Sequence, residues 1–500
     1  MACLTSVTYS INVNGEITEA FQAKKGLRQG DPISPYLFVI CMEYLNRCLS
    51  ELKVDKGFHF HSQCKKFELL HVCFADDLLL FSRGDEHSVR KLLQAFDKFS
   101  LVSGLKANNA KSSIYFGGVQ QENQLSILQE FGLVKGELPF KYLGVPLSSK
   151  KLSIAQCQPL IQKILTRIEC WSARMLSYAG RLQLIKAVLT SIQIYWSLVF
   201  LLPQKVVKTI QAACRSFLWS GRASITKRNL VSWEQLCYPK EAGGWNIINL
   251  ELWNKAAICK QLWNILKKKD KIWVRWIHGY YMKQQDWKTM PIPSQAAWVV
   301  KKILGARDYM ATLPDGDTLM EQDNFSIKKL YIALRGTPEK RNWHHMISKS
   351  IVAPKCLFIL WLAIMKRMTT CDRLQKFGIQ CDQACCLCSQ GNESLNHLFF
   401  LCPYSANVWD KLAMWCGVQR KAGAWDDEVE YLERQGASKT GKQLMYRLFV
   451  ATIVYHIWRE RNERRFNSKA SHEESVVRQC QLMMVMREEL NPKVHKMFVN

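Results

Sequence analysis

Residues 69–82, LLHVCFADDLLLFS, decide the fold of this chain, because two largely apolar runs flank the pair Asp76-Asp77. The runs 69–73 and 78–81 are rich in Val, Phe and Leu, which favours two strands joined by a tight turn. Such a hairpin places both aspartates at its tip, held by flanks that are buried in the core. Adjacent carboxylates repel each other, so the pair predicts a bound cation, and Mg²⁺ prefers carboxylate oxygens.

An ordinary hairpin turn is the alternative interpretation of this pair, because Asp is common in turns. A second motif, GLRQGDPISP at residues 26–35, leads into an expected helix for which Ser34 is the candidate N-cap. Gly30 allows a backbone to approach a base or nucleotide closely, while Arg28 and Gln29 supply hydrogen-bond donors. A helix-entry loop with coincidental glycines is the alternative here.

The two motifs, in this order, resemble the palm of reverse transcriptases from LINE-type, non-LTR retrotransposons, particularly those of plants. The stretch SGLKANNAKS at residues 103–112 resembles the next palm motif, in which Lys111 matches a lysine near the incoming nucleotide. Tyr142, Leu143 and Gly144 are similar to the beginning of the primer-grip segment. The resemblance continues in order through most of the chain, which makes it far more specific than any single motif.

The resemblance implies RNA-directed DNA polymerisation, in which a primer 3′-hydroxyl attacks the α-phosphate of a dNTP with the help of two Mg²⁺ ions. It implies an RNA template and a DNA primer as partners. Asp76 is then the principal metal ligand and Asp77 its acidic neighbour. Gln29 and Gly30 are expected to shape the pocket for the template and the nucleotide.

One part of the family pattern is missing from the 500 residues. The two-metal site of the family needs a further aspartate on a strand that precedes residues 26–35, yet the only acidic residues before Asp31 are Glu16 and Glu19. The fingers and the usual N-terminal endonuclease are also missing. We therefore expect a truncated or relic element that is inactive by itself. The alternative is a non-catalytic, zinc-containing nucleic-acid-binding protein.

Cysteines concentrate in one region of the chain, and their pattern predicts a metal site. Three thiols and one imidazole have the spacing of a tetrahedral Zn²⁺ site, at Cys385, Cys388, His397 and Cys402. Cys381 or Cys386 could replace Cys385 in this set. The surroundings resemble the zinc-binding domain that follows the reverse transcriptase in plant non-LTR elements, which implies a structural zinc ion.

The charge balance indicates a polyanionic partner. Lys and Arg number 69 and Asp and Glu 42, so 69 − 42 gives a net charge of +27, which favours nucleic acid. The densest cationic stretches are residues 267–269 and 459–465. The most apolar stretch, residues 189–203, is too short and too polar to span a bilayer, and no signal peptide is visible. We expect an intracellular protein of the cytoplasm, the nucleus or both, neither secreted nor bound to a membrane.

These patterns predict an α+β protein of several domains. A partial palm, an antiparallel sheet with helices, is expected over residues 1–149, and a helical thumb and connector over 150–305. A linker is expected at 306–324, where Pro, Gly and Asp gather. The zinc-binding domain follows at 325–415 and a helical C-terminal region at 416–500. The sequence gives no indication of the oligomeric state.

Overall fold

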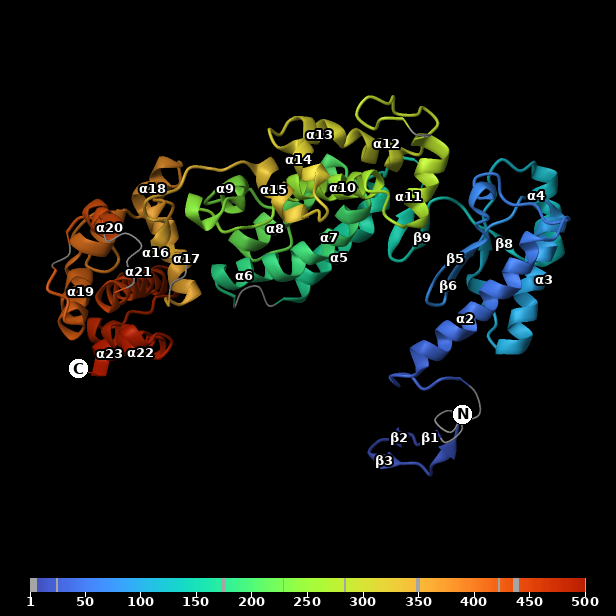
Figure 1. Cartoon of the computed structure of the whole chain (residues 1–500). Helices are drawn as coiled ribbons and strands as arrows, with labels where there is room; N and C mark the ends of the chain where they lie inside the picture. The colour runs from blue at the N-terminus through green and yellow to red at the C-terminus, as the bar shows by residue number, and fades with distance from the viewer. Residues whose placement is uncertain are drawn as a thin grey trace. The chain divides into compact units, whose positions relative to one another are not determined.

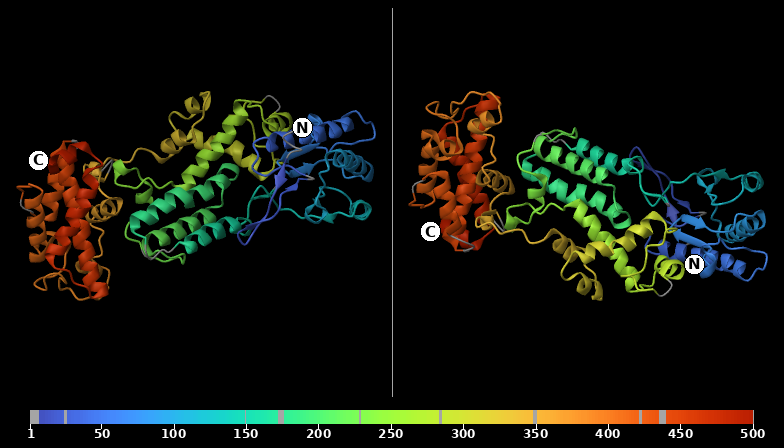
Figure 2. Two further views of the ribbon diagram at one scale, coloured as in Figure 1. Left: turned by 90° about the horizontal axis from the view of Figure 1, so that it is seen from below. Right: turned by 90° about the horizontal axis from the view of Figure 1, so that it is seen from above.

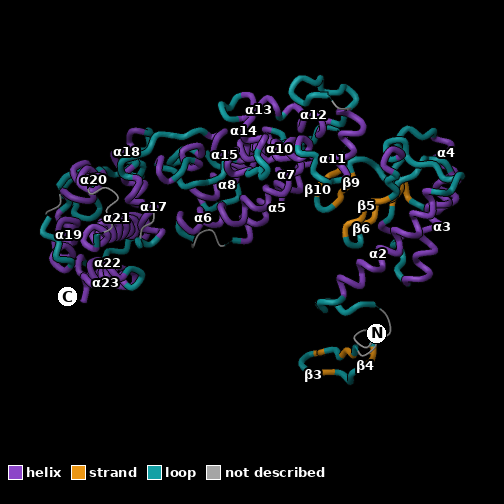
Figure 3. Tube along the Cα trace, in the orientation of Figure 1, coloured by secondary structure: helices purple, strands orange, loops and turns teal. Residues whose placement is uncertain are grey.

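The computed structural model describes residues 7–23, 26–148, 150–171, 176–227, 229–282, 285–347, 351–420, 423–434 and 440–499. Helices dominate, and each strand of the described part belongs to a two-stranded sheet (Figure 3). This mixture confirms the predicted α+β class. The chain forms two compact units (Figure 1): Met1–Ser148 with Lys271–Lys283, and Ser149–Asp270 with Gln284–Asn500.

The first unit begins with two small antiparallel strand pairs. They are β1 (Thr8–Tyr9) with β4 (Phe21–Gln22), and β2 (Asn12–Val13) with β3 (Glu16–Ile17). Asn14 and Gly15 join β2 to β3 with φ angles of 52° and 97°, a left-handed turn that suits the twist of a hairpin. All side chains from residue 8 to residue 22 are exposed, so these strands contribute nothing to a core.

Two helices, α2 (Ser34–Ser50) and α3 (Glu86–Ser103), pack on each other and build the core of the first unit. Leu45 and Leu49 of α2 meet Leu92 and Phe99 of α3 in one buried cluster. Asp85 caps α3, since its carboxylate accepts a hydrogen bond from the Ser88 N–H at 2.9 Å.

The predicted N-cap of α2 is wrong. Ile33 occupies the cap position and makes no side-chain cap, whereas Ser34 is already helical. The Ser34 hydroxyl donates instead to the carbonyl oxygen of Arg28 at 2.7 Å. The reason is the preceding turn, in which the Asp31 carboxylate accepts from the Ile33 N–H at 3.0 Å and so begins the helix one residue earlier.

The remaining elements of the first unit are short. They are η1 (Glu51–Lys53), η2 (Lys65–Phe67), β5 (His71–Phe74), β6 (Asp77–Leu80), η3 (Asn109–Lys111), β7 (Ser113–Ile114), α4 (Gln121–Phe131), β8 (Val134–Lys135), β9 (Phe140–Tyr142), β10 (Val145–Leu147), α11 (Ile272–Ile277) and η8 (His278–Met282). The last two come from the segment assigned to the thumb and connector. They join the first unit because the Trp276 indole donates to the Gln63 carbonyl at 2.9 Å and the Lys66 ammonium to the Gly279 carbonyl at 2.9 Å.

The second unit begins with a group of helices. They are η4 (Ala155–Cys157), α5 (Gln158–Cys170), α6 (Tyr178–Leu184), η6 (Ile185–Leu189), α7 (Thr190–Val199), α8 (Gln204–Ser220), α9 (Trp233–Cys237), η7 (Lys240–Ala242), α10 (Leu250–Leu266) and α12 (Trp298–Gly305). The continuous helix formed by α6, η6 and α7 is the one helix of the described residues that is long and apolar enough to cross a membrane. It packs against α5, α8 and α10, and Figure 2 shows the helices of this unit from two further sides.

The structure differs from the predicted linker at residues 306–324. This stretch contains α13 (Arg307–Ala311) and α14 (Gly316–Glu321), and α13 packs on α10. The Trp263 indole of α10 donates to the Gln322 carbonyl at 3.0 Å, and the Lys267 ammonium donates to the Glu321 carbonyl. Side chains of α10 therefore hold the backbone of a segment whose composition resembles a loop.

The C-terminal half of the second unit is a helical body in which the zinc-binding segment is embedded. Its elements are α15 (Ile327–Arg335), α16 (His344–Ile347), α17 (Pro354–Ile364), α18 (Cys371–Lys376), η9 (His397–Leu401), α19 (Pro403–Trp415), α20 (Trp425–Arg434), α21 (Gly441–Asn467), α22 (Glu473–Glu488) and α23 (Pro492–Val499). The apolar helix α17 packs on α21, and α19 packs on α22. The predicted boundary between residues 415 and 416 therefore separates helices that pack on one another, and it does not divide two domains.

Candidate functional site

The aspartate hairpin forms as the sequence predicts, with one change at its tip. β5 and β6 pair in an antiparallel register in which Phe74 lies opposite Asp77. The turn therefore consists of Ala75 and Asp76, and Ala75 adopts a left-handed φ of 50°. Asp76 lies at the tip, whereas Asp77 is the first residue of β6.

The flanks of the hairpin are less buried than predicted. Phe74 is 61% exposed, and Cys73 is also exposed. Leu78 and Leu80 of β6 are only partly buried, against the core between α2 and α3. β5 and β6 pair only with each other among the described residues, so no neighbouring strand covers the edges of this hairpin.

Tyr142 lies near the aspartate pair. Burial raises the pKa of Tyr142, and the negative charge of Asp77 raises it further. Tyr142 ends β9 and lies opposite Val145 of β10. Leu143 and Gly144, with φ angles of 49° and 81°, form the two-residue turn between them. The segment predicted as the primer grip is thus a hairpin whose tyrosine is close enough to Asp77 to be affected by its charge.

The other residues predicted for the polymerase site come from two separate segments of the chain. Arg28, Gln29 and Gly30 are exposed in the loop before α2, and Lys111 is exposed at the end of η3. Among the described residues, no hydrogen bond or ion pair that we observe joins any of them to the aspartates.

The residues present do not fit a two-metal Mg²⁺ site. Asp76 and Asp77 are both exposed, and within the described ranges no third acidic, histidine or cysteine side chain joins them in a group that could hold a metal. Hard divalent ions need several oxygen ligands in fixed geometry. Two carboxylates on one turn supply too few of them.

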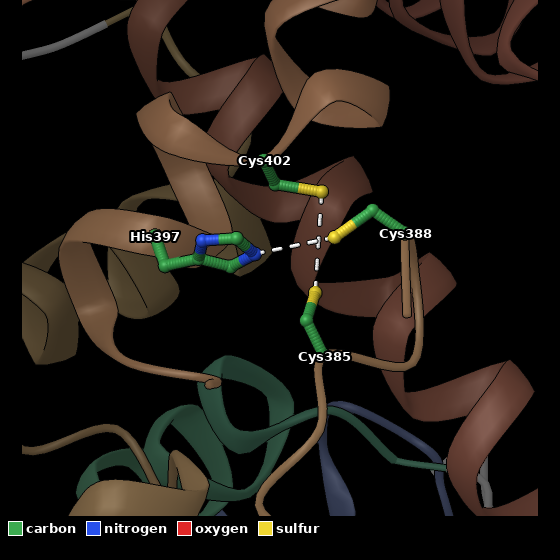
Figure 4. Close-up of side chains that lie close together, drawn as sticks. All are labelled: Cys385, Cys388, His397 and Cys402. Carbon is green, nitrogen blue, oxygen red and sulfur yellow. Dashed lines mark hydrogen bonds between the residues drawn. The ribbon is translucent and has the colours of Figure 1, made fainter. Parts of the chain in front are cut away.

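A second group of side chains has the geometry that the first one lacks. The ligand atoms of Cys385, Cys388, His397 and Cys402 all lie within 4.8 Å of one another (Figure 4). Cys385 and Cys402 are buried, and the other two are partly buried. The Cys388 sulfur lies 3.3 Å from Nε2 of His397, and the Cys385 and Cys402 sulfurs are 3.9 Å apart. Four such donors around one point fit Zn²⁺.

A tight turn positions the first two cysteines. The Ser389 N–H donates to the Cys385 carbonyl at 2.7 Å, and the Cys385 N–H donates to the Gly391 carbonyl at 2.7 Å. A side chain at Gly391 would meet the His397 ring at 3.0 Å, so glycine allows the imidazole to approach the turn.

His397 is the first residue of the π-helical turn η9, and Cys402 directly follows its last residue. The His397 carbonyl accepts from the Cys402 N–H at 2.8 Å, which fixes the spacing of these two ligands. π-helical turns are rare and often occur at functional sites.

The structure distinguishes between the alternative cysteines. The Cys386 sulfur points away from the group and donates to the Arg461 carbonyl at 3.6 Å, and burial raises its pKa. Cys381 accepts a contact from the Gln383 amide instead. The described geometry therefore includes Cys385 and leaves out both alternatives.

The local contacts also favour a thiolate. The hydrogen bond from Cys402, supported by the backbone N–H groups of Leu387 and Cys388, lowers the pKa of Cys385 to about 5. The same contact raises the pKa of Cys402, because the proton stays with that sulfur. A thiolate is the form of cysteine that binds metals.

Sequence reasoning missed the support of this site. The Glu393 carboxylate is fully buried and forms two bonds with the Arg461 guanidinium of α21, at 2.6 and 3.0 Å. It also accepts from the Cys371 N–H at 3.0 Å and pairs with Arg465 at 3.3 Å. Glu393 lies between the cysteine turn and His397, so this ion pair fastens the metal-binding segment to α21. The sequence offered only a Glu four residues before His397, and nothing in it marks this carboxylate as buried.

Residues of both dense cationic stretches make contacts within the second unit. Arg464 donates to the Glu460 carboxylate at 2.7 Å and to the Leu387 carbonyl at 3.0 Å, within the body that holds the metal-binding segment. Lys267 pairs with Asp323 at 3.6 Å, and the Lys269 ammonium lies 4.7 Å from the centre of the Trp263 ring. Residues of these stretches thus make contacts within the chain, and their contact with nucleic acid stays a prediction.

Comparisons with known proteins agree with this architecture. Residues 1–147 match the family model described as reverse transcriptase (RNA-dependent DNA polymerase). Residues 325–409 match the model described as zinc-binding in reverse transcriptase.

Several curated proteins are similar to parts of the chain. A putative ribonuclease H protein of Arabidopsis thaliana is 33% identical over 129 residues, which is 26% of this chain and 21% of that protein. An uncharacterized 149 kDa protein of transposon TX1 from Xenopus laevis is 27% identical over 221 residues, 42% of this chain and 16% of that protein. The Pol polyprotein of the type-2 retrotransposable element R2DM from Drosophila melanogaster is 32% identical over 146 residues, 27% of this chain and 13% of that protein.

The matched part of the chain thus spans about a fifth or less of each of these relatives. The palm-like first unit and the cysteine–histidine segment correspond to the two matching family models, and two of these relatives come from mobile elements. The chain therefore belongs to the reverse transcriptases of non-LTR retrotransposons and carries the zinc-binding domain of that family.

Proposed function

We propose that the chain binds primed RNA template for RNA-directed DNA synthesis, in which a primer 3′-hydroxyl attacks the α-phosphate of a dNTP. The observation that carries the proposal is the hairpin that displays Asp76 and Asp77 beside Tyr142. The net charge of +27 supports a polyanionic partner. In this proposal Arg28, Gln29 and Gly30 contact the template and the nucleotide.

Lys111 approaches the triphosphate in the same proposal, and the turn of Leu143 and Gly144 approaches the primer. Each of these residues is exposed or partly buried, so each is open to a ligand.

We further propose that residues 1–500 bind the primed template without extending it. Phosphoryl transfer depends on fixed charges around the reacting groups, and misplacement by about 1 Å already costs on the order of a hundredfold in rate. Asp76 and Asp77 project from one turn without a third carboxylate among the described residues.

Cys385, Cys388, His397 and Cys402 hold one structural Zn²⁺ in this proposal. The metal would supply folding free energy to a segment rich in turns. Zinc thiolates and unpaired cysteines persist in reducing compartments, so we place the protein inside the cell, in the cytoplasm or the nucleus.

Primer extension and binding, measured on the same zinc-loaded chain, test the proposal. The substrate is a DNA primer annealed to an RNA template, supplied with Mg²⁺ and four dNTPs. Wild type is compared with Asp76→Ala and with Asp97→Ala, which removes the same charge from an exposed position on α3. We expect all three chains to bind with similar affinity and none to extend the primer.

Two results would contradict parts of the proposal. Extension by wild type and Asp97→Ala but not by Asp76→Ala would show a complete polymerase site and overturn the proposed incompleteness. Failure of every chain to bind the primed template at low salt would overturn the nucleic-acid-binding function.

A further inference from the structure

An aromatic cluster in the second unit carries two ammonium groups on one ring. Trp245 is buried, and Phe358 of α17 stacks on it with ring centroids 5.3 Å apart and planes 28° apart. Trp361 meets the same indole edge-on at 5.7 Å. Phe358 and Trp361 thus pack against part of the Trp245 ring.

Lys186 and Lys240 both lie over the indole of Trp245. Their ammonium nitrogens are 6.0 and 5.4 Å from the ring centroid. Lys186 comes from the π-helical turn η6 and Lys240 from η7, so two separate elements bring the charges together. An indole face attracts each cation separately, but it does not cancel the repulsion between the two.

No carboxylate within the described residues forms an ion pair with either ammonium group. The acidic residue next in sequence, Glu241, pairs with Lys340 at 3.7 Å. Burial, followed by the positive charge of Lys240, lowers the pKa of Lys186 to about 8. Burial likewise lowers the pKa of Lys240. Two half-buried cations therefore face each other without a counter-charge.

The backbone at Lys186 adds an independent indication. Residues Ile185–Leu189 form a π-helical turn within a helix that is otherwise α-helical on both sides. Such turns carry a cost in backbone geometry and occur often at functional sites.

We propose that Lys186 and Lys240, supported by Trp245, bind one phosphate group of a nucleic-acid backbone. A phosphate oxyanion between the two ammonium groups removes their repulsion and forms charge-assisted hydrogen bonds with both. Contacts of this kind fix the position of nucleic acid without reading its sequence. The identity of the phosphate as a nucleic-acid phosphate rests on the proposed function, whereas the anion site itself does not.

Protection from lysine acylation tests the site directly. The zinc-loaded full chain is labelled briefly at pH 8 with an amine-reactive ester, and the modification of each lysine is quantified by mass spectrometry. Labelling is repeated with an RNA–DNA hybrid and, separately, with inorganic phosphate. We expect the hybrid to reduce labelling of Lys186 and Lys240 at least fivefold, while Lys163, exposed on α5, serves as the reference.

Each outcome has a distinct meaning. Protection by inorganic phosphate but not by the hybrid would show a site for free phosphate and overturn the assignment to a nucleic-acid backbone. Binding of the hybrid without protection of either lysine would overturn the site and leave the proposed function standing. Absence of hybrid binding together with protection by phosphate would overturn the proposed function and keep the anion site.

Salt dependence supplies a second readout. Lys186→Ala with Lys240→Ala removes the contacts to one phosphate, so it should reduce the slope of log K against log[salt] by about 0.7 to 0.9 and weaken binding about tenfold at low salt. Lys186→Arg with Lys240→Arg should retain the wild-type slope. The matched control, Lys205→Ala with Lys208→Ala on exposed positions of α8, removes the same charge. An equal or larger change in the control would overturn the proposal.

Discussion

The aspartate hairpin and the cysteine–histidine segment are both candidate metal sites, but only one has its ligands assembled. Asp76 and Asp77 are exposed at the end of a two-stranded hairpin that has no further strand beside it among the described residues. Cys385, Cys388, His397 and Cys402 lie within 4.8 Å of one another and are buried or partly buried.

The origin of the ligands explains the contrast. One short segment supplies all four zinc-type ligands, so a turn, a π-helical turn and local hydrogen bonds suffice to arrange them. A two-metal carboxylate site draws ligands from separate strands, and its geometry depends on neighbours that cover and align those strands. A metal site whose ligands all come from one short segment can thus form within that segment. A site whose ligands come from distant segments depends on the whole sheet.

Removal of a zinc ligand should have the largest effect. Cys388→Ser should abolish zinc binding and unfold the region around α17, α19 and α21, because structural zinc contributes about 10–16 kcal/mol in zinc-finger peptides. Zinc content and hydrogen exchange of the full chain measure both effects. The control is Cys386→Ser, whose sulfur lies outside the ligand group and should leave zinc in place. If Cys388→Ser kept its zinc and its protection from hydrogen exchange, the cysteine–histidine segment would not be the structural metal site that we describe.

Disruption of the buried ion pair should have the next largest effect. Glu393→Gln leaves the Arg461 guanidinium, 1% exposed, without its counter-charge, which should destabilise the second unit by about 3–5 kcal/mol. Denaturant unfolding of the full chain measures the loss. Lys366→Ala is the control, because its ion pair with Asp426 is exposed and should contribute no more than about 1 kcal/mol. An equal loss of unfolding free energy in the two variants would show that the buried ion pair does not stabilise the second unit more than an exposed one does.

Acid should destabilise the second unit through His456 of α21. This side chain is 4% exposed, and burial, followed by the charges of Arg459 and Lys355, lowers its pKa from 6.5 to about 4. The unfolded chain then binds a proton more readily than the folded chain between these values. Stability should therefore fall as the pH drops from about 6.5 to about 4, by up to about 3 kcal/mol.

His456→Gln isolates this effect from acid release of zinc. The difference in unfolding free energy between wild type and the variant, measured at several pH values, should change across this window. A difference that stays constant with pH would mean that His456 takes up its proton equally well in both states.

Neutralisation of the aspartate tip should have the smallest effect. Asp76→Asn changes an exposed side chain for which no ion pair is observed among the described residues, so the unfolding free energy of the first unit should change by less than about 0.5 kcal/mol. Thermal unfolding of the full chain measures it, with Asp97→Asn on α3 as a control of equal charge. A loss as large as that of Glu393→Gln would show that the hairpin tip is structurally supported after all.

The features that could be predicted from the sequence are those that form from residues close together in the chain. The strands around Asp76 and Asp77 follow from their apolar flanks, and the zinc ligand group follows from its spacing. The linker prediction failed because the side chains of Trp263 and Lys267 form hydrogen bonds with backbone carbonyls of this stretch, although its composition is typical of a loop. Arg461 belongs to the cationic stretch 459–465, and nothing in that stretch reveals its buried partner Glu393, which is far away in sequence. Pairing across long sequence separations decides such cases, and residue patterns do not report it.

The metal content of a single purified chain tests the central contrast most directly. The full chain is equilibrated with Zn²⁺ and with Mn²⁺, a hard ion that prefers oxygen ligands as Mg²⁺ does, and is then dialysed and analysed for both metals. We expect one retained Zn²⁺ per chain and no retained Mn²⁺. Retention of Mn²⁺ in wild type and its loss in Asp76→Ala, or the absence of Zn²⁺ in a folded chain, would contradict it.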